Sequence, residues 1–200
     1  MNAARRSALL LALFWGATAC IASRGGSCRD PGDAGEVARL AATTDSTVLA
    51  VQKAPDSEAT WLRQYLQAVV DRTASLEACG RITTAGDLRT AARIGLASAQ
   101  LGVPSVERAY RWARRAVVTD TSDRRSWRMM AMAWDQLQIA QKQPQWFATV
   151  ITCANTDGRC ALATIDTSRV TDPQRVELGL RTLVQQRMIV GSLNRARGRP

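Results

Sequence analysis

Hydrophobic residues follow a helical period over most of the chain after residue 34. In residues 57–79, apolar side chains recur at steps of three and four, which is the spacing of one helix face. The same period predicts helices over 36–52, 84–101, 104–118 and 123–142, and a last helix that opens at Thr171 and continues past Val184. Thr84 and Asp87 have the spacing of a capping box, and Pro104 suits the first turn of a helix.

The helical period stops at Pro144. Residues 146–153 and 160–165 are rich in β-branched and aromatic side chains, and the turn signal Asn-Thr-Asp-Gly lies between them at 155–158. We expect a β-hairpin at about 146–165. The predicted fold class is therefore mainly α, an array of helical hairpins with one small β-hairpin near the C-terminal part.

One stretch has the spacing of a repeat. Trp127, Met130, Ala131 and Trp134 match the aromatic and small positions of a tetratricopeptide helix. A solenoid needs at least three repeats to bury a continuous core, and fewer than three are visible. The pattern predicts tetratricopeptide-like packing of neighbouring helices rather than a peptide-binding superhelix.

The first nineteen residues have the three parts of a signal peptide: Arg5-Arg6, an apolar stretch over 8–15, and small residues before Cys20. The apolar stretch is shorter than the roughly 20 residues that span a bilayer. Ala17-Thr18-Ala19-Cys20 resembles the bacterial lipobox, which implies lipidation of Cys20 and a membrane-anchored lipoprotein of the cell envelope. The same small residues also suit ordinary cleavage, which would give a periplasmic or secreted protein, and an uncleaved cytosolic chain is the third alternative.

The composition after Cys20 suggests the order of the remaining parts. Residues 20–34 are rich in Gly, Ser, Asp and Arg, so we expect a flexible tether there. A single helical domain is predicted over 35–190, and a basic disordered tail over 191–200.

Four cysteines remain when Cys20 is set aside, and an exported protein would lie in a compartment that permits disulfides. Three pairings are open. We favour Cys153 with Cys160, because the turn between them would bring the flanking segments antiparallel and place the two residues opposite each other. Cys28 with Cys79 then follows by elimination. The alternative for either pair is two buried free thiols.

The composition excludes several kinds of catalytic and metal site and indicates none. The chain has no histidine, which removes the usual general base near neutral pH and the commonest metal ligand. No Cys-x-x-Cys spacing and no Gly-rich phosphate loop occurs, so we expect neither a metal nor another cofactor. Hydrolysis by paired carboxylates remains open.

The formal charge of +10 favours contact with anionic surfaces, although basic residues that only solvate helix faces would give the same charge.

One polar cluster precedes the predicted hairpin. Asp135, Gln138 and Lys142 are spaced by three and four residues, which places them on one helix face beside the start of the hairpin. They could form a small polar pocket with Lys142 as the cation, or a solvated face with one intrahelical contact.

Six tryptophans are present, and Trp61, Trp112, Trp127 and Trp134 have the spacing of core residues. Trp146 with Phe147 is the pair that we consider for a binding surface.

Residues 135–150 read Asp-Gln-Leu-Gln-Ile-Ala-Gln-Lys-Gln-Pro-Gln-Trp-Phe-Ala-Thr-Val, and Asp157-Gly158, Ile165-Asp166 and Leu178-Gly179-Leu180 follow. The order of these pieces resembles that in an uncharacterised bacterial family, domain of unknown function 6624, over about 120–183. The resemblance implies a mainly helical domain with a small β element and supplies no activity. Phe147, Ala148 and Val150 replace the Tyr, Gly and Gln that are usual there. Asp135, Pro144, Gln145 and Thr149 are the matching polar or turn positions.

These observations lead to two hypotheses of different classes. The first is a non-enzymatic, lipid-anchored domain that binds another protein or an envelope polymer. The second is a hydrolase or small-ligand enzyme with a polar site at Asp135, Gln138, Lys142, Gln145 and Thr149. Nucleic acid is not an expected partner, because acids alternate with arginines along most of the predicted helices.

Overall fold

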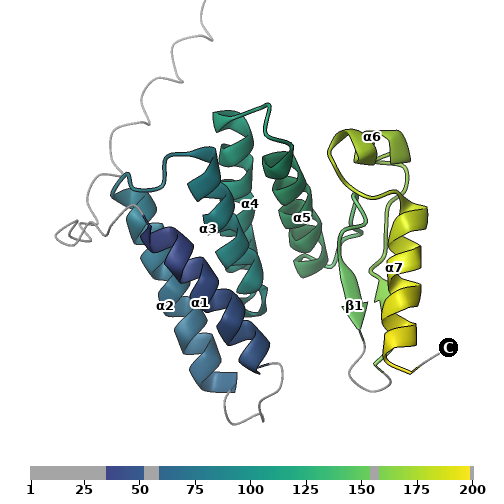
Figure 1. Cartoon of the computed structure of the whole chain (residues 1–200), viewed down its shortest axis with the longest axis horizontal. Helices are drawn as coiled ribbons and strands as arrows, with labels where there is room; N and C mark the ends of the chain where they lie inside the picture. Colours follow the sequence, from purple (N-terminus) through teal and green to yellow (C-terminus); the bar gives the residue numbers. More distant parts are fainter. Residues whose placement is uncertain (1–34, 52–58, 154–157, 199–200) are drawn as a thin grey trace, which may run out of the picture. The chain divides into compact units, whose positions relative to one another are not determined.

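The computed structural model describes residues 35–51, 59–153 and 158–198 (Figure 1). The predicted fold class is confirmed, because the described chain is mainly helical and carries one small antiparallel hairpin. The predictions for residues 1–34, which comprise the signal peptide, lipidation at Cys20, the tether and the partner Cys28, lie outside the described residues. The elements are α1 (Glu36–Val51), α2 (Ala59–Ala78), α3 (Ala85–Ala97), a 3-10 turn (Ala99–Leu101), α4 (Val103–Thr119), α5 (Arg124–Ala140), β1 (Ile151–Cys153), β2 (Cys160–Leu162), α6 (Asp172–Glu177) and α7 (Leu183–Ala196).

Side chains cap the first turns of α3 and α5, and the cap of α3 is the one that the sequence predicts. Thr84 precedes α3 and accepts a hydrogen bond from the Asp87 N–H at 3.1 Å. Asp123 precedes α5 and accepts from the Arg125 N–H at 3.0 Å. These bonds satisfy backbone donors that have no partner inside the helix.

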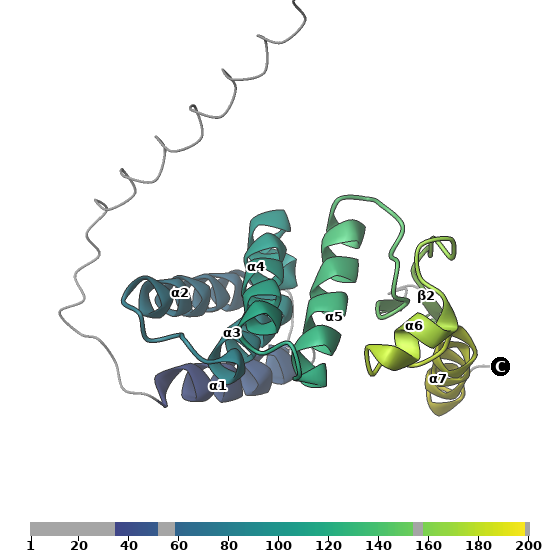
Figure 2. The same cartoon turned by 90° about the horizontal axis from the view of Figure 1, so that it is seen from above.

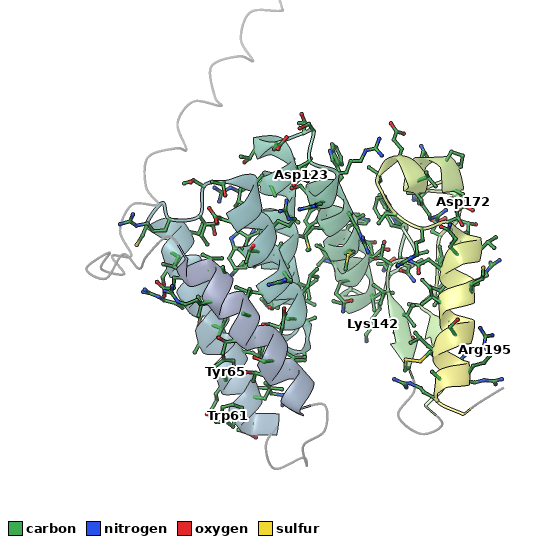
Figure 3. All side chains as sticks on the ribbon, in the orientation of Figure 1. Trp61, Tyr65, Asp123, Lys142, Asp172 and Arg195 are labelled. Carbon is green, nitrogen blue, oxygen red and sulfur yellow. A yellow bond between two sulfur atoms is a disulfide. The ribbon has the colours of Figure 1, made fainter. Side chains whose placement is uncertain are left out.

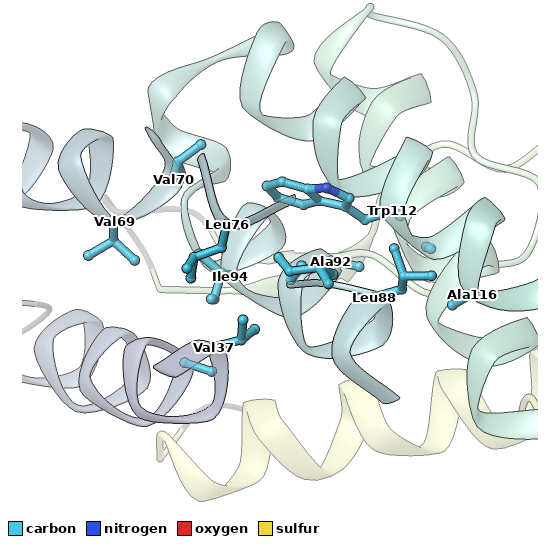
Figure 4. Packing of buried hydrophobic residues seen from close by; sticks show 14 residues of the cluster. Val37, Val69, Val70, Leu76, Leu88, Ala92, Ile94, Trp112 and Ala116 are labelled. Atoms are coloured by element: carbon cyan, nitrogen blue, oxygen red, sulfur yellow. The ribbon is translucent and has the colours of Figure 1, made fainter. Parts of the chain in front are cut away.

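Helices α1 to α5, which we call the helical region (residues 35–140), pack around an apolar core. α3 lies against α1, α4 and α5 in the middle of this region (Figures 1 and 2). Trp112 of α4 is buried in the same cluster as Leu76, Leu88 and Ile94 (Figure 4). Close approach of α3 to α4 depends on Gly95, since a Cβ there would lie 2.7 Å from the Cβ of Ala109.

Polar bonds join the helices around this core. Arg72 of α2 donates two hydrogen bonds to Glu36 of α1, at 2.6 and 2.9 Å. The indole N–H of Trp112 donates to Glu77 of α2 at 2.7 Å, so this buried side chain also has its polar atom satisfied. The helical region therefore combines an apolar interior with paired charges near its surface.

The C-terminal region (residues 145–198 as described) is built on the hairpin. β1 and β2 are antiparallel, and Cys153 lies opposite Cys160 in the register. The disulfide between them is present, with Cα atoms 3.9 Å apart, so the favoured pairing is confirmed. Cys79 is also disulfide-bonded, and its partner lies outside the described residues. Asn194 fastens α7 to β2, because its side chain accepts from the Cys160 N–H at 2.8 Å and donates to the Cys160 carbonyl at 3.1 Å.

Two boundaries in the C-terminal region differ from the prediction. The strands are shorter than predicted, and residues 146–150 form a loop. The N–H groups of Trp146, Phe147, Thr149 and Val150 bond to side chains instead of a strand. The predicted last helix is two helices. α6 ends at Glu177, and Gly179, two residues later, has a φ of 73° that lets the Leu180 N–H reach the Arg175 carbonyl at 2.8 Å, as in a Schellman motif. Thr182 and Gln185 then cap α7 reciprocally.

Two further expectations are corrected. α7 continues to Ala196, so residues 191–196 are helical and do not belong to a disordered tail. Trp61 does not lie in the core. Its side chain is 56% exposed and stacks on Tyr65 with ring centroids 5.6 Å apart. Both residues are labelled on α2 in Figure 3.

Candidate functional site

Asp135, the acid that the sequence singles out, holds the loop after α5. It is completely buried on α5 and accepts four hydrogen bonds. One carboxylate oxygen accepts from the N–H groups of Trp146 and Phe147 at 2.8 and 2.9 Å. The other accepts from the N–H and hydroxyl of Thr149 at 2.9 and 2.8 Å. Both oxygens are therefore occupied, and Asp135 fixes the path of residues 146–149.

Gln145 plays the same role from inside that loop. Its fully buried side-chain amide donates to the carbonyls of Val150 and Ala163 at 3.0 and 2.9 Å and accepts from the Val150 N–H at 2.8 Å. Its backbone bonds to Thr164 and Asp166, which makes a short parallel bridge beside the hairpin. Ala148 lies in the loop that Asp135 and Gln145 hold. Its φ of 58° is a conformation that glycine adopts at the least cost.

The structure separates the other members of the predicted polar pocket. α5 ends at Ala140, so Lys142 is exposed in the turn after the helix and not on its face. Lys142 has a φ of 60°, and the Gln143 N–H bonds to the Gln138 carbonyl at 2.8 Å, which is the pattern of a helix C-cap. The expectation that Asp135, Gln138 and Lys142 share one face is wrong because the helix stops first. Asp135, Gln145 and Thr149 are brought together.

The fixed loop separates two neighbouring pockets between α5 and the turn from α6 to α7. The first has a volume of about 510 Å³, and the second about 290 Å³. Each has walls from the same three segments: α5, the loop over 147–149, and residues 178–180. We call the two pockets together the α5 groove. The first pocket is lined by Thr121, Ser122, Arg124, Trp127, Phe147, Arg169, Val170, Gln174, Glu177 and Leu178, and the second by Arg128, Met132, Thr149, Ile151, Gly179, Leu180, Arg181, Gln186 and Ile189.

Each pocket of the α5 groove contains two arginines. Arg124 and Arg169 line the first, and Arg128 and Arg181 line the second. Glu177 is the only acid among the described lining residues. Within the part of the chain that the structure describes, Arg124, Arg128 and Arg181 form no ion pair with an acid. The groove therefore has an excess of positive charge next to aromatic and aliphatic walls.

Aromatic side chains connect this groove to the helical region. Trp134 of α5 lies between Tyr110 and Trp146, with ring centroids 5.2 and 4.8 Å away. The guanidinium of Arg169 lies over the Trp146 ring at 5.4 Å, within the range of a cation–π contact. Trp146 thus lies between Trp134 of α5 and an arginine of the first pocket.

Buried Arg175 ties α6 to the same loop. It donates to the Trp146 carbonyl and to Asp172, both at 3.0 Å, although only 1% of its side chain is exposed. Asp172 in turn accepts from the Leu183 N–H at 2.9 Å, where α7 begins. This series of bonds sets the position of both C-terminal helices relative to the loop.

Two acids next to lining residues of the first pocket have lowered pKa values: Asp123 precedes Arg124, and Asp166 pairs with Arg169. A hydrogen bond from the Ser126 hydroxyl is the main cause that lowers the pKa of Asp123, and the Arg125 N–H and the charges of Arg89 and Arg125 add to it against the effect of burial. The Ser168 hydroxyl is the main cause for Asp166, followed by the Ser168 N–H, and Arg169 contributes. These carboxylates hold the segments that carry Arg124 and Arg169.

The sequence singles out Asp135, Gln145 and Thr149 for a polar ligand site, whereas in the structure their side chains hold the loop, and the groove was not predicted. The predicted polar pocket includes none of Arg124, Arg128, Arg169 and Arg181. These four residues are scattered over α5 and two loops, so no local spacing joins them. The order of Asp135, Gln145 and Thr149 was the signal that could locate the loop, because the motif positions coincide with its anchors.

The comparisons with known proteins add no relative. The chain matches no protein-family model, no curated protein and no solved structure. The resemblance to domain of unknown function 6624 stays a prediction. Among the described residues, no group of three or more Cys, Asp or Glu side chains is placed to hold a metal ion. None of the described helices combines the length and apolar character that crossing a membrane requires.

Proposed function

We propose that this chain is a lipid-anchored binding domain of the bacterial cell envelope, and that the α5 groove takes an acidic segment of another envelope protein. The observation that carries the proposal is the pair of arginines in each pocket of the groove. Arginine binds carboxylates through two parallel hydrogen bonds, which gives such a groove a preference for Asp or Glu side chains.

The spacing of the arginines suggests the form of the segment. Arg124 and Arg128 are four residues apart on α5, which corresponds to a rise of about 6 Å along the helix. In an extended peptide, side chains two residues apart lie on the same face at about 6.7 Å. An acidic residue, any residue and a second acidic residue would thus place one carboxylate in each pocket. Trp127, Phe147 and Leu178 offer apolar contacts beside the first carboxylate.

The bonding of Asp135 argues against the alternative of a hydrolase. A general acid or base must reach the reacting atoms, directly or through one water. Asp135 has no exposed surface, and its oxygens already accept four hydrogen bonds from the loop. Its role in the proposal is to position Phe147 and Thr149 as walls of the groove.

Peptide titration tests the binding site. The probe is the pentapeptide Ala-Glu-Leu-Glu-Ala with blocked ends, added to the chain from residue 20 with Cys20→Ser, and followed by tryptophan fluorescence. The matched control peptide has Gln at both Glu positions. We expect the double variant Arg124→Gln with Arg128→Gln to weaken binding of the Glu peptide by about tenfold, equivalent to about 1.4 kcal/mol.

A second double variant separates the groove from net charge. Arg111 and Arg114 are exposed on α4 and line no part of the groove, so Arg111→Gln with Arg114→Gln removes the same charge elsewhere. This variant is expected to change the affinity by less than about twofold in 0.15 M salt, where distant surface charges are screened. Equal weakening by both variants, or equal binding of the Gln peptide, would overturn the proposed site.

Intact mass tests the anchoring. Protein purified from membranes of its native host is expected to begin at Cys20 and to carry additional acyl mass. An unmodified full-length mass from the soluble fraction would contradict both the anchor and the envelope location.

A further inference from the structure

The outer face of α7 is apolar and basic, and little of the described chain covers it. α7 lies on the far side of the hairpin from α5, and its main contacts are with β2 (Figures 1 and 2). Val184 is 61% exposed and Met188, one turn further on, is 66% exposed. Together with Arg187, Gly191, Ser192 and Arg195 they line a shallow groove along the helix, which we call the α7 face.

The charge around this face has one sign. From residue 178 to the end, the sequence contains five arginines and no acid. Arg187 forms no ion pair within the described residues, and Arg195 bonds only to the Ser192 hydroxyl, at 3.1 Å. Figure 3 labels Arg195 near the end of α7.

A second basic surface, on α4, differs from the α7 face in its charge and in its exposed apolar residues. Arg111, Arg114, Arg115 and exposed Val118 also lie together, on α4. That helix carries Glu107, and two of its arginines pair with acids of α2, Arg108 with Asp71 and Arg115 with Glu77. The α4 surface is thus partly neutralised and has one exposed apolar residue. The α7 face has two exposed apolar residues in line, and no acid of the described residues forms an ion pair with its arginines.

From this combination we infer that the α7 face binds an anionic phospholipid surface. Helices that lie in the membrane interface place apolar side chains at the level of the acyl chains while arginines extend to the headgroups. Val184 and Met188 supply the apolar part, and Arg187 and Arg195 supply the charge. The contact is independent of the acyl chain proposed at Cys20. It would place the outer face of α7 against the bilayer and the hairpin on the side of α7 away from it.

Vesicle sedimentation tests this inference without the anchor. The protein is the chain from residue 20 with Cys20→Ser, and the vesicles contain either 30% phosphatidylglycerol in phosphatidylcholine or phosphatidylcholine alone. The expected result is binding to the anionic vesicles that falls as salt is raised, and weak binding to the neutral ones. Since each arginine near a charged membrane contributes roughly five- to tenfold to partitioning, Arg187→Gln with Arg195→Gln should lower binding by about thirtyfold.

Two further variants separate the apolar contribution and the net charge from the effect of Arg187 and Arg195. Val184→Ser with Met188→Ser removes the apolar part without changing charge, and it should lower binding at least fivefold. Arg111→Gln with Arg114→Gln removes equal charge from α4, and its binding should fall less than threefold. Unchanged circular dichroism and thermal midpoints would show that the variants fold. The inference is overturned if the α4 variant loses as much binding as the α7 variant, or if neutral vesicles bind equally well.

Self-association is the remaining outcome to separate. In analytical ultracentrifugation without vesicles, the chain is expected to remain monomeric. A dimer that dissociates in the Val184→Ser with Met188→Ser variant would show that a second copy covers the α7 face, and would overturn the inference. Loss of vesicle binding leaves peptide binding in the α5 groove intact, because Arg187 and Arg195 do not line that groove.

Discussion

The two regions of this protein are stabilised by different kinds of interaction. The helical region has an apolar core that runs from Val37 to Ala133, and its charges pair near the surface. The C-terminal region contributes no residue to that core cluster. Instead, its loop donates hydrogen bonds to buried Asp135, its own Gln145 and Arg175 are buried, and a disulfide closes its hairpin. A short segment that cannot form an apolar core of its own can still be fixed when most of its buried polar atoms are hydrogen-bonded, as they are here, although the Nε of Arg175 has no partner among the described residues. The binding surfaces that we propose both use this second region.

The largest expected effect is loss of the carboxylate that joins the two regions. Asp135→Ala leaves three backbone N–H groups and one hydroxyl without their acceptor in a buried place. Each unsatisfied buried donor costs about 1–3 kcal/mol, so we expect the free energy of unfolding to fall by about 4 kcal/mol. Denaturant unfolding measures it. Asp120→Ala is the control, because exposed Asp120 bonds only within its own turn, to Ser122, and should cost less than about 1 kcal/mol. Equal losses would mean that the loop is not held as described.

The next effect concerns the disulfide of the hairpin. In the chain-entropy model, a loop of about eight residues contributes roughly 2.5 kcal/mol, and Cys153→Ser with Cys160→Ser should remove it. Since this crosslink lies wholly in the C-terminal region, amide hydrogen exchange should rise in β1, β2 and α7 and stay unchanged in α3 and α4. Uniform acceleration over both regions would show that they unfold as one unit and would remove the distinction between them.

How far the sequence predicts each region follows from the same difference. Helices with an apolar face are visible in a three-to-four residue period, and Thr84 and Pro104 indicate where two of them begin, so most helices of this region could be predicted. The loop over 146–150 was predicted as a strand, because Trp146, Phe147 and Val150 favour strands and nothing local shows that Asp135 captures their backbone. The break between α6 and α7 was missed although Gly179 and Thr182 signal it. The arginines of the α5 groove meet only through tertiary packing.

One substitution made in both regions should have opposite effects. Gly95→Ala places a Cβ 2.7 Å from the Cβ of Ala109 and 3.1 Å from its Cα, so α3 and α4 must separate. We expect a loss of about 1–3 kcal/mol. In α7, Gly191→Ala meets only the flexible end of Arg195, at 3.4 Å, and should gain about 0.5–1 kcal/mol from helix propensity. Thermal unfolding of both variants measures the two signs. A stabilised Gly95→Ala protein would contradict the close contact between the two helices.

The smallest effect is a dependence on pH that differs between the regions. The folded protein lowers the pKa of Asp123 below its ordinary value of 3.8, chiefly through the Ser126 hydroxyl. The unfolded chain therefore binds more protons in this range, so the stabilisation is complete well above pH 4 and is lost as the pH falls through the folded pKa. Asp123→Asn keeps an N-cap but not the charge, and we expect a shallower loss of stability between about pH 5 and 2. Asp166→Asn should flatten the same curve when amide exchange is followed in the C-terminal region, because the pKa of Asp166 is also lowered. If neither variant changes the slope, other carboxylates carry the acid sensitivity, and Asp123 and Asp166 act only through their hydrogen-bond geometry.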